Sequence, residues 1–216
     1  MKTKLNYAVF GLGRYGIAVA KELVEDGAEV LAVDINEEVV NEASAVIPYC
    51  KCADVTDGEV IKQLGIANMD VVIISMAGDL EASVMATMLC KEAGVETVIV
   101  KCSNEMNCKI MQKIGADQVV IPESESGIRL AKNLLSSGFV DIIELSKDVS
   151  MVELSVRPEW EGKNLIELSL RKKYGINAVA LLEGKTVCTD INPELPLSTA
   201  MKLIVIGNTT KLNKLK

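Results

Sequence analysis

The chain has 216 residues, of which 49% are hydrophobic and 25% are charged, a balance typical of a globular protein with a substantial core. Its formal net charge of -7 and its scattered basic residues argue against nucleic-acid binding, which needs a concentrated basic surface. No apolar run approaches the ~20 residues of a membrane-spanning helix, and residues 1–4 lead into a strand pattern rather than a signal sequence. We therefore expect a cytosolic protein of two domains.

Short apolar runs alternate with helical patterns from Leu5 to about Leu135, which predicts a parallel sheet covered by helices on both faces. Most of the runs are almost entirely apolar, as expected of strands that are buried on both faces. They predict a complete doubly wound Rossmann sheet of α/β class. The expected strands are Leu5–Phe10, Glu29–Val33, Pro48–Ala53, Val71–Ser75, Thr97–Val100 and Gln118–Ile121.

Three glycines, Gly11, Gly13 and Gly16, follow the first strand. In a nucleotide-binding loop the first permits a sharp turn, the second lets the backbone approach a diphosphate, and the third lets the helix pack closely. The helix that begins near Arg14 presents free N–H groups and the positive end of its dipole to an anion. The loop therefore predicts a phosphate site built from backbone.

Asp34 ends the second strand, close to the spacing from Gly16 at which a carboxylate meets the ribose hydroxyls. The alternative role is a helix cap, which Asp34-Ile35-Asn36-Glu37 also suits, and the two roles can coexist. A carboxylate here repels a 2′-phosphate, which argues against a phosphorylated dinucleotide.

Polar residues follow the other strands, at the edge where this architecture binds ligands. Each also has a structural alternative, since Asp54 suits a cap of the helix expected at Asp57–Leu64 and Glu123 suits a first-turn acid. Together they offer polar groups for an adenosine and a charged tail. These residues are Asp54, Ser75–Asp79, Lys101 and Pro122–Glu125.

The six cysteines contain no CxxC pair, and the chain has no histidine, so no zinc site is expected. Cys50 and Cys52 alternate along a strand and Cys90 lies on an apolar helix, which favours reduced, buried thiols. Met85 and Met88, three residues apart on the helix expected at 80–93, are expected to fill the core.

The segment Gly138–Asp148 changes character and is expected to be a connection, so we place a domain boundary near residue 145. Residues 1–145 then form the Rossmann-type domain, and residues 146–216 form a small α+β domain with a marginal core of its own. Its expected elements are the helix Leu165–Lys173 and the strands Met151–Val156, Ala178–Leu182, Lys185–Cys188 and Lys202–Val205.

These features resemble the cytosolic regulatory subunits of bacterial Trk/Ktr-type potassium uptake systems, whose module is the RCK domain. The glycine loop at 9–16 and the second strand at 30–36 also occur in many dehydrogenases. The Ile-Gly-Ala-Asp block, the following Pro-Glu and the small mixed domain are more specific. The resemblance covers nearly the whole chain. Its blocks are 9–16, 30–36, 113–117, 122–123 and 203–207.

The resemblance implies an RCK N-terminal (TrkA-N) domain that binds ATP, ADP or NAD(H) and an RCK C-terminal (TrkA-C) domain that can bind a second effector. It implies homodimers that assemble into rings, commonly octamers, on the inner face of the cell membrane against a potassium-translocating subunit. Nucleotide exchange would gate the pore. The activating nucleotide, the second effector and the membrane partner are not readable from the sequence.

The resemblance also assigns roles to single residues. Arg14 would approach the outer phosphate, which suits the paired donors of a guanidinium, although a solvated arginine at a helix start is the alternative. Lys101 resembles a basic residue near the phosphates, and Glu123 resembles a glutamate that reaches the nucleotide or its divalent cation across a dimer interface. The candidate nucleotide-binding residues are Gly11, Gly13, Arg14, Tyr15, Gly16, Asp34, Ile35, Asp54, Val55, Ser75, Lys101 and Glu123.

The main alternative is an NAD-dependent oxidoreductase, since the glycine loop with Asp34 fits one equally well. Such enzymes commonly place a His, or a Tyr with a Lys four residues later, at the reacting carbon, and this chain has neither. Acid–base work at neutral pH would fall to Lys or Cys. We therefore predict a regulator without catalytic residues. A structural protein that holds a nucleotide permanently is the third alternative.

Overall fold

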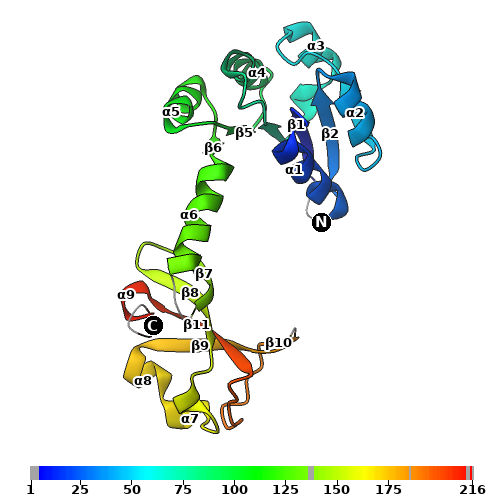
Figure 1. Ribbon diagram of the computed structural model, residues 1–216. Coiled ribbons are helices and arrows are strands. Elements are labelled where there is room, and N and C mark those ends of the chain that lie inside the picture. Colours follow the sequence, from blue (N-terminus) through cyan, green and yellow to red (C-terminus); the bar gives the residue numbers. More distant parts are fainter. Residues whose placement is uncertain (1–4, 136–138, 185, 213–214, 216) are drawn as a thin grey trace. The chain divides into compact units, whose positions relative to one another are not determined.

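The computed structural model describes residues 5–135, 139–184, 186–212 and 215 (Figure 1). The chain forms two compact units, Met1–Pro122 and Glu123–Lys216. The domain boundary that the sequence suggests near residue 145 stays a prediction.

The first unit contains a six-stranded parallel sheet in the order β3-β2-β1-β4-β5-β6. After β3 at one edge the chain returns to the middle of the sheet, which makes β1 and β4 neighbours and places the topological switch point between them. All six expected strands are present, with ends that differ by no more than one residue, and the doubly wound fold is confirmed. They are β1 (Asn6–Phe10), β2 (Glu29–Asp34), β3 (Tyr49–Cys52), β4 (Val71–Ile74), β5 (Thr97–Lys101) and β6 (Gln118–Val120).

Five helices connect these strands, and in four of them an Asn or Asp side chain accepts a backbone N–H of the first turn. The four caps are Asn36, Asp57, Asp79 and Asn104. In the described part of the chain, no helix has both the length and the apolar character to cross a membrane. The helices are α1 (Arg14–Glu25), α2 (Glu37–Ala43), α3 (Gly58–Gln63), α4 (Leu80–Glu92) and α5 (Glu105–Ile114), with a short 3-10 turn, η1 (Ile66–Asn68), before β4.

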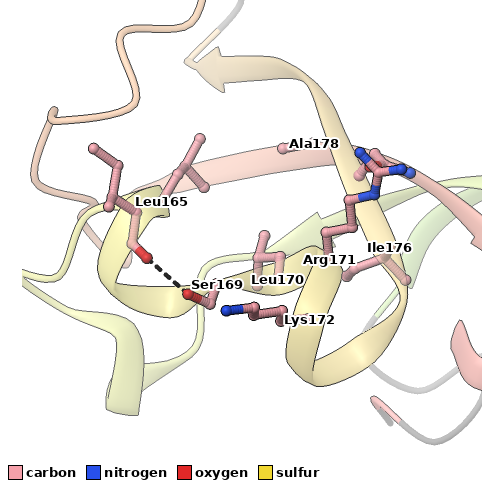
Figure 2. A pocket seen from close by; sticks show the side chains of 9 residues that line it. Leu165, Ser169, Leu170, Arg171, Lys172, Ile176 and Ala178 are labelled. Atoms are coloured by element: carbon pink, nitrogen blue, oxygen red, sulfur yellow. Dashed lines mark hydrogen bonds between the residues drawn. The ribbon is translucent and has the colours of Figure 1, made fainter.

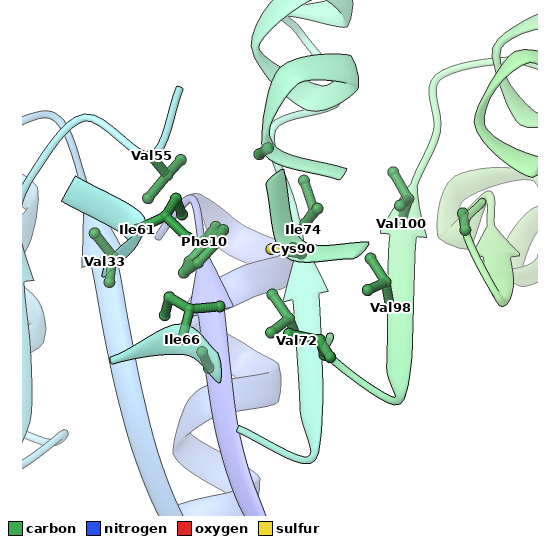
Figure 3. Close-up of a cluster of buried hydrophobic side chains, with 14 of the residues drawn as sticks. Phe10, Val33, Val55, Ile61, Ile66, Val72, Ile74, Cys90, Val98 and Val100 are labelled. Atoms are coloured by element: carbon green, nitrogen blue, oxygen red, sulfur yellow. The ribbon is translucent and has the colours of Figure 1, made fainter. Parts of the chain in front are cut away.

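Successive residues of the central strands enter two different cores, because side chains alternate across a sheet. Phe10 and Ile74 lie in the cluster under α3, α4 and α5 (Figure 3), whereas their neighbours Val9 and Ile73 lie in the cluster under α1 and α2. These strands therefore bury both faces of the sheet.

Helix α4 buries small residues and exposes large ones. Ser83, Ala86, Thr87 and Cys90 form its buried face, which leaves Met85 and Met88 39% and 42% exposed. The expectation that these methionines fill the core is wrong, since they lie outside the face that α4 buries.

The cysteines of the first unit differ in burial. Burial raises the pKa of Cys90 to about 12, as expected for an inert core thiol. Cys52, by contrast, is exposed on edge strand β3, and Cys50 is only half-buried. The expectation of buried thiols therefore fails on this strand.

The Ile-Gly-Ala-Asp block joins α5 to β6, and its Asp117 side chain makes hydrogen bonds to α4 and β5. Gly115 ends α5 in the left-handed region with φ 116°. The Asp117 carboxylate then accepts hydrogen bonds from the Val98 N–H (2.7 Å) and from Lys91 Nζ (2.9 Å). Lys91 also donates to the Val95 carbonyl (3.1 Å). The block thereby ties α4 and β5 together at the edge of the sheet opposite the glycine loop.

The second unit is built on a five-stranded antiparallel sheet in the order β10-β9-β11-β8-β7. Its core contains Trp160, Leu154 and Leu203, and the expected small α+β fold is confirmed. Its elements are α6 (Pro122–Leu135), β7 (Phe139–Glu144), β8 (Val149–Ser155), η2 (Pro158–Trp160), α7 (Leu165–Leu168), α8 (Leu170–Tyr174), β9 (Ile176–Glu183), β10 (Thr186–Cys188), β11 (Met201–Asn208) and α9 (Thr209–Leu212).

Two sequence expectations for this unit are wrong. The connection expected at Gly138–Asp148 contains β7, which pairs antiparallel with β8. The single helix expected at Leu165–Lys173 is two short helices, because Ser169 between them adopts the left-handed conformation with φ 47°. The strand expected from Lys185 begins at Thr186, and Lys185 itself lies outside the described residues.

The hydrogen bonds of the Asp117 carboxylate predict a contribution to the free energy of unfolding that is lost at acidic pH. Burial alone would raise the pKa of Asp117, but the hydrogen bonds from Val98 and Lys91 outweigh it and hold the pKa below its ordinary value. Asp117→Ala should lower the free energy of unfolding at pH 7 by about 1 kcal/mol, since it leaves the Val98 N–H unpaired while the side chain is partly solvent-screened. Urea unfolding followed by circular dichroism measures the difference.

The pH dependence separates this interaction from a general packing effect. A depressed carboxyl pKa stabilises the fold above the unfolded pKa of ~3.9 and is lost as pH falls through the folded value. The gap between wild type and Asp117→Ala should therefore narrow below about pH 4, and an unchanged gap at pH 3 would contradict it. Glu25→Ala, which removes an exposed ion pair with Lys21, is the control and should cost under ~0.5 kcal/mol.

Candidate functional site

A cavity of about 530 Å³ lies at the carboxyl ends of β1 to β5, within the size range of small-molecule sites. It brings together seven of the predicted residues: Gly11, Asp34, Ile35, Asp54, Val55, Ser75 and Lys101. Its lining also includes Met76–Asp79 from the predicted segment Ser75–Asp79, and four residues that the sequence did not single out, namely Val33, Ala53, Thr56 and Ala82. The first three of these lie at a strand end or in the following turn, whereas Ala82 lies in the first turn of α4.

The glycine loop is shaped by two contacts that admit no side chain. Gly11 is left-handed with φ 86° and donates its N–H to the Val33 carbonyl at 2.8 Å. A Cβ at Gly16 would lie 1.9 Å from the Gly11 carbonyl oxygen, so α1 starts directly against the loop. Gly13 differs, because a Cβ there would meet nothing within 4 Å.

The N-terminus of α1 lacks the side-chain cap that α2 to α5 have. Its N-cap is Gly13, which offers no side-chain acceptor. The first-turn N–H groups of a helix have no partner within the helix. Helix α1 therefore has a glycine at the N-cap, whereas α2 to α5 have Asn or Asp there. Its uncapped N–H groups suit an external anion.

Asp34 connects the second strand to the glycine loop. Its Oδ2 accepts the Leu12 N–H at 2.7 Å, and its Oδ1 accepts the Asn36 N–H at 2.9 Å. Asn36, and not Asp34, caps α2 by accepting the Glu38 N–H. Since each carboxylate oxygen can accept more than one hydrogen bond, Asp34 is a fixed acceptor at the cavity wall that can still receive a ligand hydroxyl.

Asp54 has its own local support. Its Oδ1 accepts both the hydroxyl and the N–H of Thr56, at 2.6 and 2.9 Å. These hydrogen bonds lower the pKa of Asp54, which keeps the carboxylate ionised. Asp57 caps α3 instead, so the alternative role of Asp54 as the cap of that helix does not hold.

Lys101 brings a positive charge to the cavity from the end of β5. Its Nζ lies 5.6 Å from the centre of the Tyr15 ring, in the first turn of α1. Arg14 is exposed at the start of the same helix and, with Gly13, Tyr15 and Gly16, does not line the cavity. Glu123 lies in the first turn of α6, in the second unit. The roles of Arg14 and Glu123 stay predictions.

The second unit has a cavity of its own, of about 370 Å³, formed by α7, α8 and the start of β9 (Figure 2). Leu165, Leu170 and Ile176 contribute apolar side chains, and Arg171 and Lys172 contribute positive charge. Among the described residues no three His, Cys, Asp or Glu side chains are grouped to hold a metal ion.

Comparison with known proteins identifies relatives over the whole chain. The TrkA-N domain model matches residues 7–122. The Ktr system potassium uptake protein C of Bacillus subtilis (strain 168) is 40% identical over 216 residues, which cover 98% of this chain and 96% of the relative. The match thus includes both units.

Two solved structures of the protein GsuK share the fold. The crystal structure of the GsuK RCK domain is 25% identical with a TM-score of 0.54, over 98% of this chain and 46% of that one. The crystal structure of GsuK bound to ADP is also 25% identical, with a TM-score of 0.51, over 62% of this chain and 34% of that one. This chain therefore spans less than half of each GsuK chain.

The contact at Gly16 predicts that alanine substitutions at Gly16 and Gly13 have different effects on stability. Gly16→Ala should destabilise the first unit by about 1–3 kcal/mol, since the new methyl group forces α1 away from the Gly11 carbonyl. Gly13→Ala should change stability by less than ~0.5 kcal/mol, because its φ of -66° suits alanine and the space is open. Thermal unfolding of both variants tests this, and equal losses would show that the contact does not decide the loop.

Proposed function

Since the chain belongs to the family of TrkA-N domain proteins that includes the Ktr potassium uptake proteins, we propose that it is a nucleotide-sensing regulatory subunit of a potassium uptake system. The single observation that carries the nucleotide part is the arrangement at the carboxyl edge of the sheet. The cavity there is bordered by Gly11 at the start of the glycine loop, by the fixed carboxylate of Asp34 and by Lys101, and the loop leads directly into the uncapped helix α1.

The cavity suggests how an adenine nucleotide would lie. The phosphates would approach the N-terminus of α1, where backbone N–H groups and the helix dipole favour anions. The ribose hydroxyls would donate to Asp34, and the adenine would enter between Val55 and Met76, near Asp54. The ligand is ATP, ADP or NAD(H), and the ADP complex of GsuK supports this class.

Two further contacts belong to the proposal. Arg14, exposed next to Gly13, would reach the outermost phosphate. Glu123 would reach the nucleotide, or a divalent cation at its phosphates, from the partner of a homodimer. Gly13, Tyr15 and Gly16 would act through the loop backbone and the start of α1.

An oxidoreductase role is the weaker alternative. The titratable side chains at the cavity are Asp34, Asp54, Asp79 and Lys101, and the three carboxylates already accept hydrogen bonds that fix the loops. Such groups suit binding better than proton transfer. The Bacillus subtilis relative is a potassium uptake protein. Turnover of NADH with any metabolite by the purified chain would overturn this part of the proposal.

A regulatory role requires different affinities for two conformations, because a ligand that binds both equally shifts neither. Coupling between two sites is typically ~1–3 kcal/mol, whereas moving a pore from mostly shut to mostly open takes ~5.5 kcal/mol. One site is insufficient. We therefore propose that homodimers assemble into a ring, with an octamer as the expected size, on the cytosolic face of a potassium-translocating membrane subunit.

Calorimetry with purified chain tests the nucleotide site. Asp34→Ala should weaken ATP, ADP, AMP and NAD about tenfold or more, since each loses a charge-assisted hydrogen bond at the ribose. Asp34→Asn removes the charge with a smaller change of shape: its carbonyl can still accept the Leu12 N–H, whereas its amide group replaces the oxygen that accepts the Asn36 N–H. Arg14→Ala should weaken ATP more than AMP or NAD, and equal loss for all three would remove Arg14 from the outer phosphate.

Native mass spectrometry tests the assembly and the ligand together. We expect an even number of subunits, with eight as the largest closed species, and bound adenine nucleotide retained from the cells. A monomer at all concentrations, with and without added nucleotide, would exclude the ring mechanism.

A further inference from the structure

Lys101 and Tyr15 meet across the switch point of the sheet. Lys101 ends β5, whereas Tyr15 lies in α1, which follows β1, and β4 separates these two strands. The Lys101 side chain therefore reaches past the end of β4 to place Nζ 5.6 Å from the centre of the Tyr15 ring. This separation is within the ~6 Å at which an aromatic face attracts a cation.

The first turn of α1 combines two features. Its N-terminal backbone groups favour an anion, and its Tyr15 ring contacts the ammonium of Lys101, which comes from β5. An aromatic face attracts the ammonium through its quadrupole and brings no opposite formal charge to the site.

A lysine side chain has many rotamers, and ordering it when a ligand binds costs affinity. Both Tyr15 and Lys101 are half-buried, so the ring restricts the side chain before a ligand arrives. This preorganisation lowers the cost of binding only for ligands that use the ammonium. An adenosine without phosphates gains nothing from it.

We propose that Tyr15 is a positioning residue which holds the Lys101 ammonium at the phosphate end of the cavity and thereby increases the preference of the site for phosphorylated adenosines. The proposal rests on the proposed nucleotide function and refines it. Tyr15 acts through Lys101 and does not contact the ligand with its ring.

A double-mutant cycle on the full chain tests this coupling, with adenosine, AMP, ADP and ATP as calorimetric probes. Tyr15→Leu should weaken ADP and ATP about three- to tenfold, as expected for the loss of a cation–π contact, and adenosine less than about twofold. Tyr15→Phe keeps the ring and should retain the preference for ADP and ATP over adenosine that Tyr15→Leu loses. In a Lys101→Met background, Tyr15→Leu should have no further effect.

Tyr49→Leu is the matched control, since Tyr49 is 64% exposed on β3 and does not line this cavity. It should change no affinity. Equal loss of adenosine and ADP in Tyr15→Leu, or a loss that persists in the Lys101→Met background, would overturn the positioning role. If wild type itself binds none of the four probes, the inference fails before any variant is compared, and the nucleotide function fails with it if NAD and NADH also do not bind.

A second measurement needs no change at Tyr15 and so does not depend on how that variant folds. In NMR spectra of wild type with labelled lysine, the Lys101 ε-methylene protons should be shifted upfield by the ring, and Lys101→Met identifies the signal. ADP should move this signal, whereas adenosine should leave it in place. A Lys101 signal at the position of an exposed lysine would overturn the proposal.

Discussion

The close contact between α1 and the glycine loop is the constraint on which the candidate site depends. Because Gly16 has no Cβ, the first turn of α1 starts directly against the Gly11 carbonyl. The helix N-terminus is then held at the end of β1, beside the switch point where doubly wound sheets bind ligands. The Asp34 carboxylate secures the same loop from the second strand through the Leu12 N–H.

The distribution of helix caps separates the Asn and Asp residues that cap helices from those that line the candidate site. Asn36, Asp57 and Asn104 each close the N-terminus of a helix, whereas Asp34 and Asp54 face the cavity with their carboxylates held by backbone and hydroxyl donors. Asp79 does both, since it caps α4 and lines the cavity. Ser83 strengthens this turn by donating to the Met76 carbonyl. Hydrogen bonds of both side chains therefore tie the cavity wall to the start of α4.

The proposed regulation needs only small differences at such a site. The fold already holds the polar groups of the site in place. A bound ligand therefore stabilises the conformation in which the site has this arrangement. A modest preference in each subunit, repeated around a ring, reaches the magnitude that a pore requires. The Lys101–Tyr15 contact would make that preference depend on phosphate through two elements from opposite sides of the switch point.

The sequence by itself determined the class of the fold, the six parallel strands and the glycine loop, because these depend on local patterns. Apolar runs specify buried strands, and glycine spacing specifies a tight turn into a helix. The seven predicted residues at the cavity could be located in the same way, since parallel strands all end at one edge of the sheet.

Only the tertiary structure decided which partner each side chain has. Strand β7 is identified by its pairing with β8, since the expected connection rested on Gly138 and the polar residues Ser146–Asp148 that flank the strand. Met85 and Met88 are partly exposed because α4 turns the face with Ser83, Ala86, Thr87 and Cys90 toward the core. The Tyr15–Lys101 contact likewise joins residues far apart in the chain, and a spacing rule describes only neighbours along the sequence. Contacts of this kind are fixed by packing between elements, which no local pattern records.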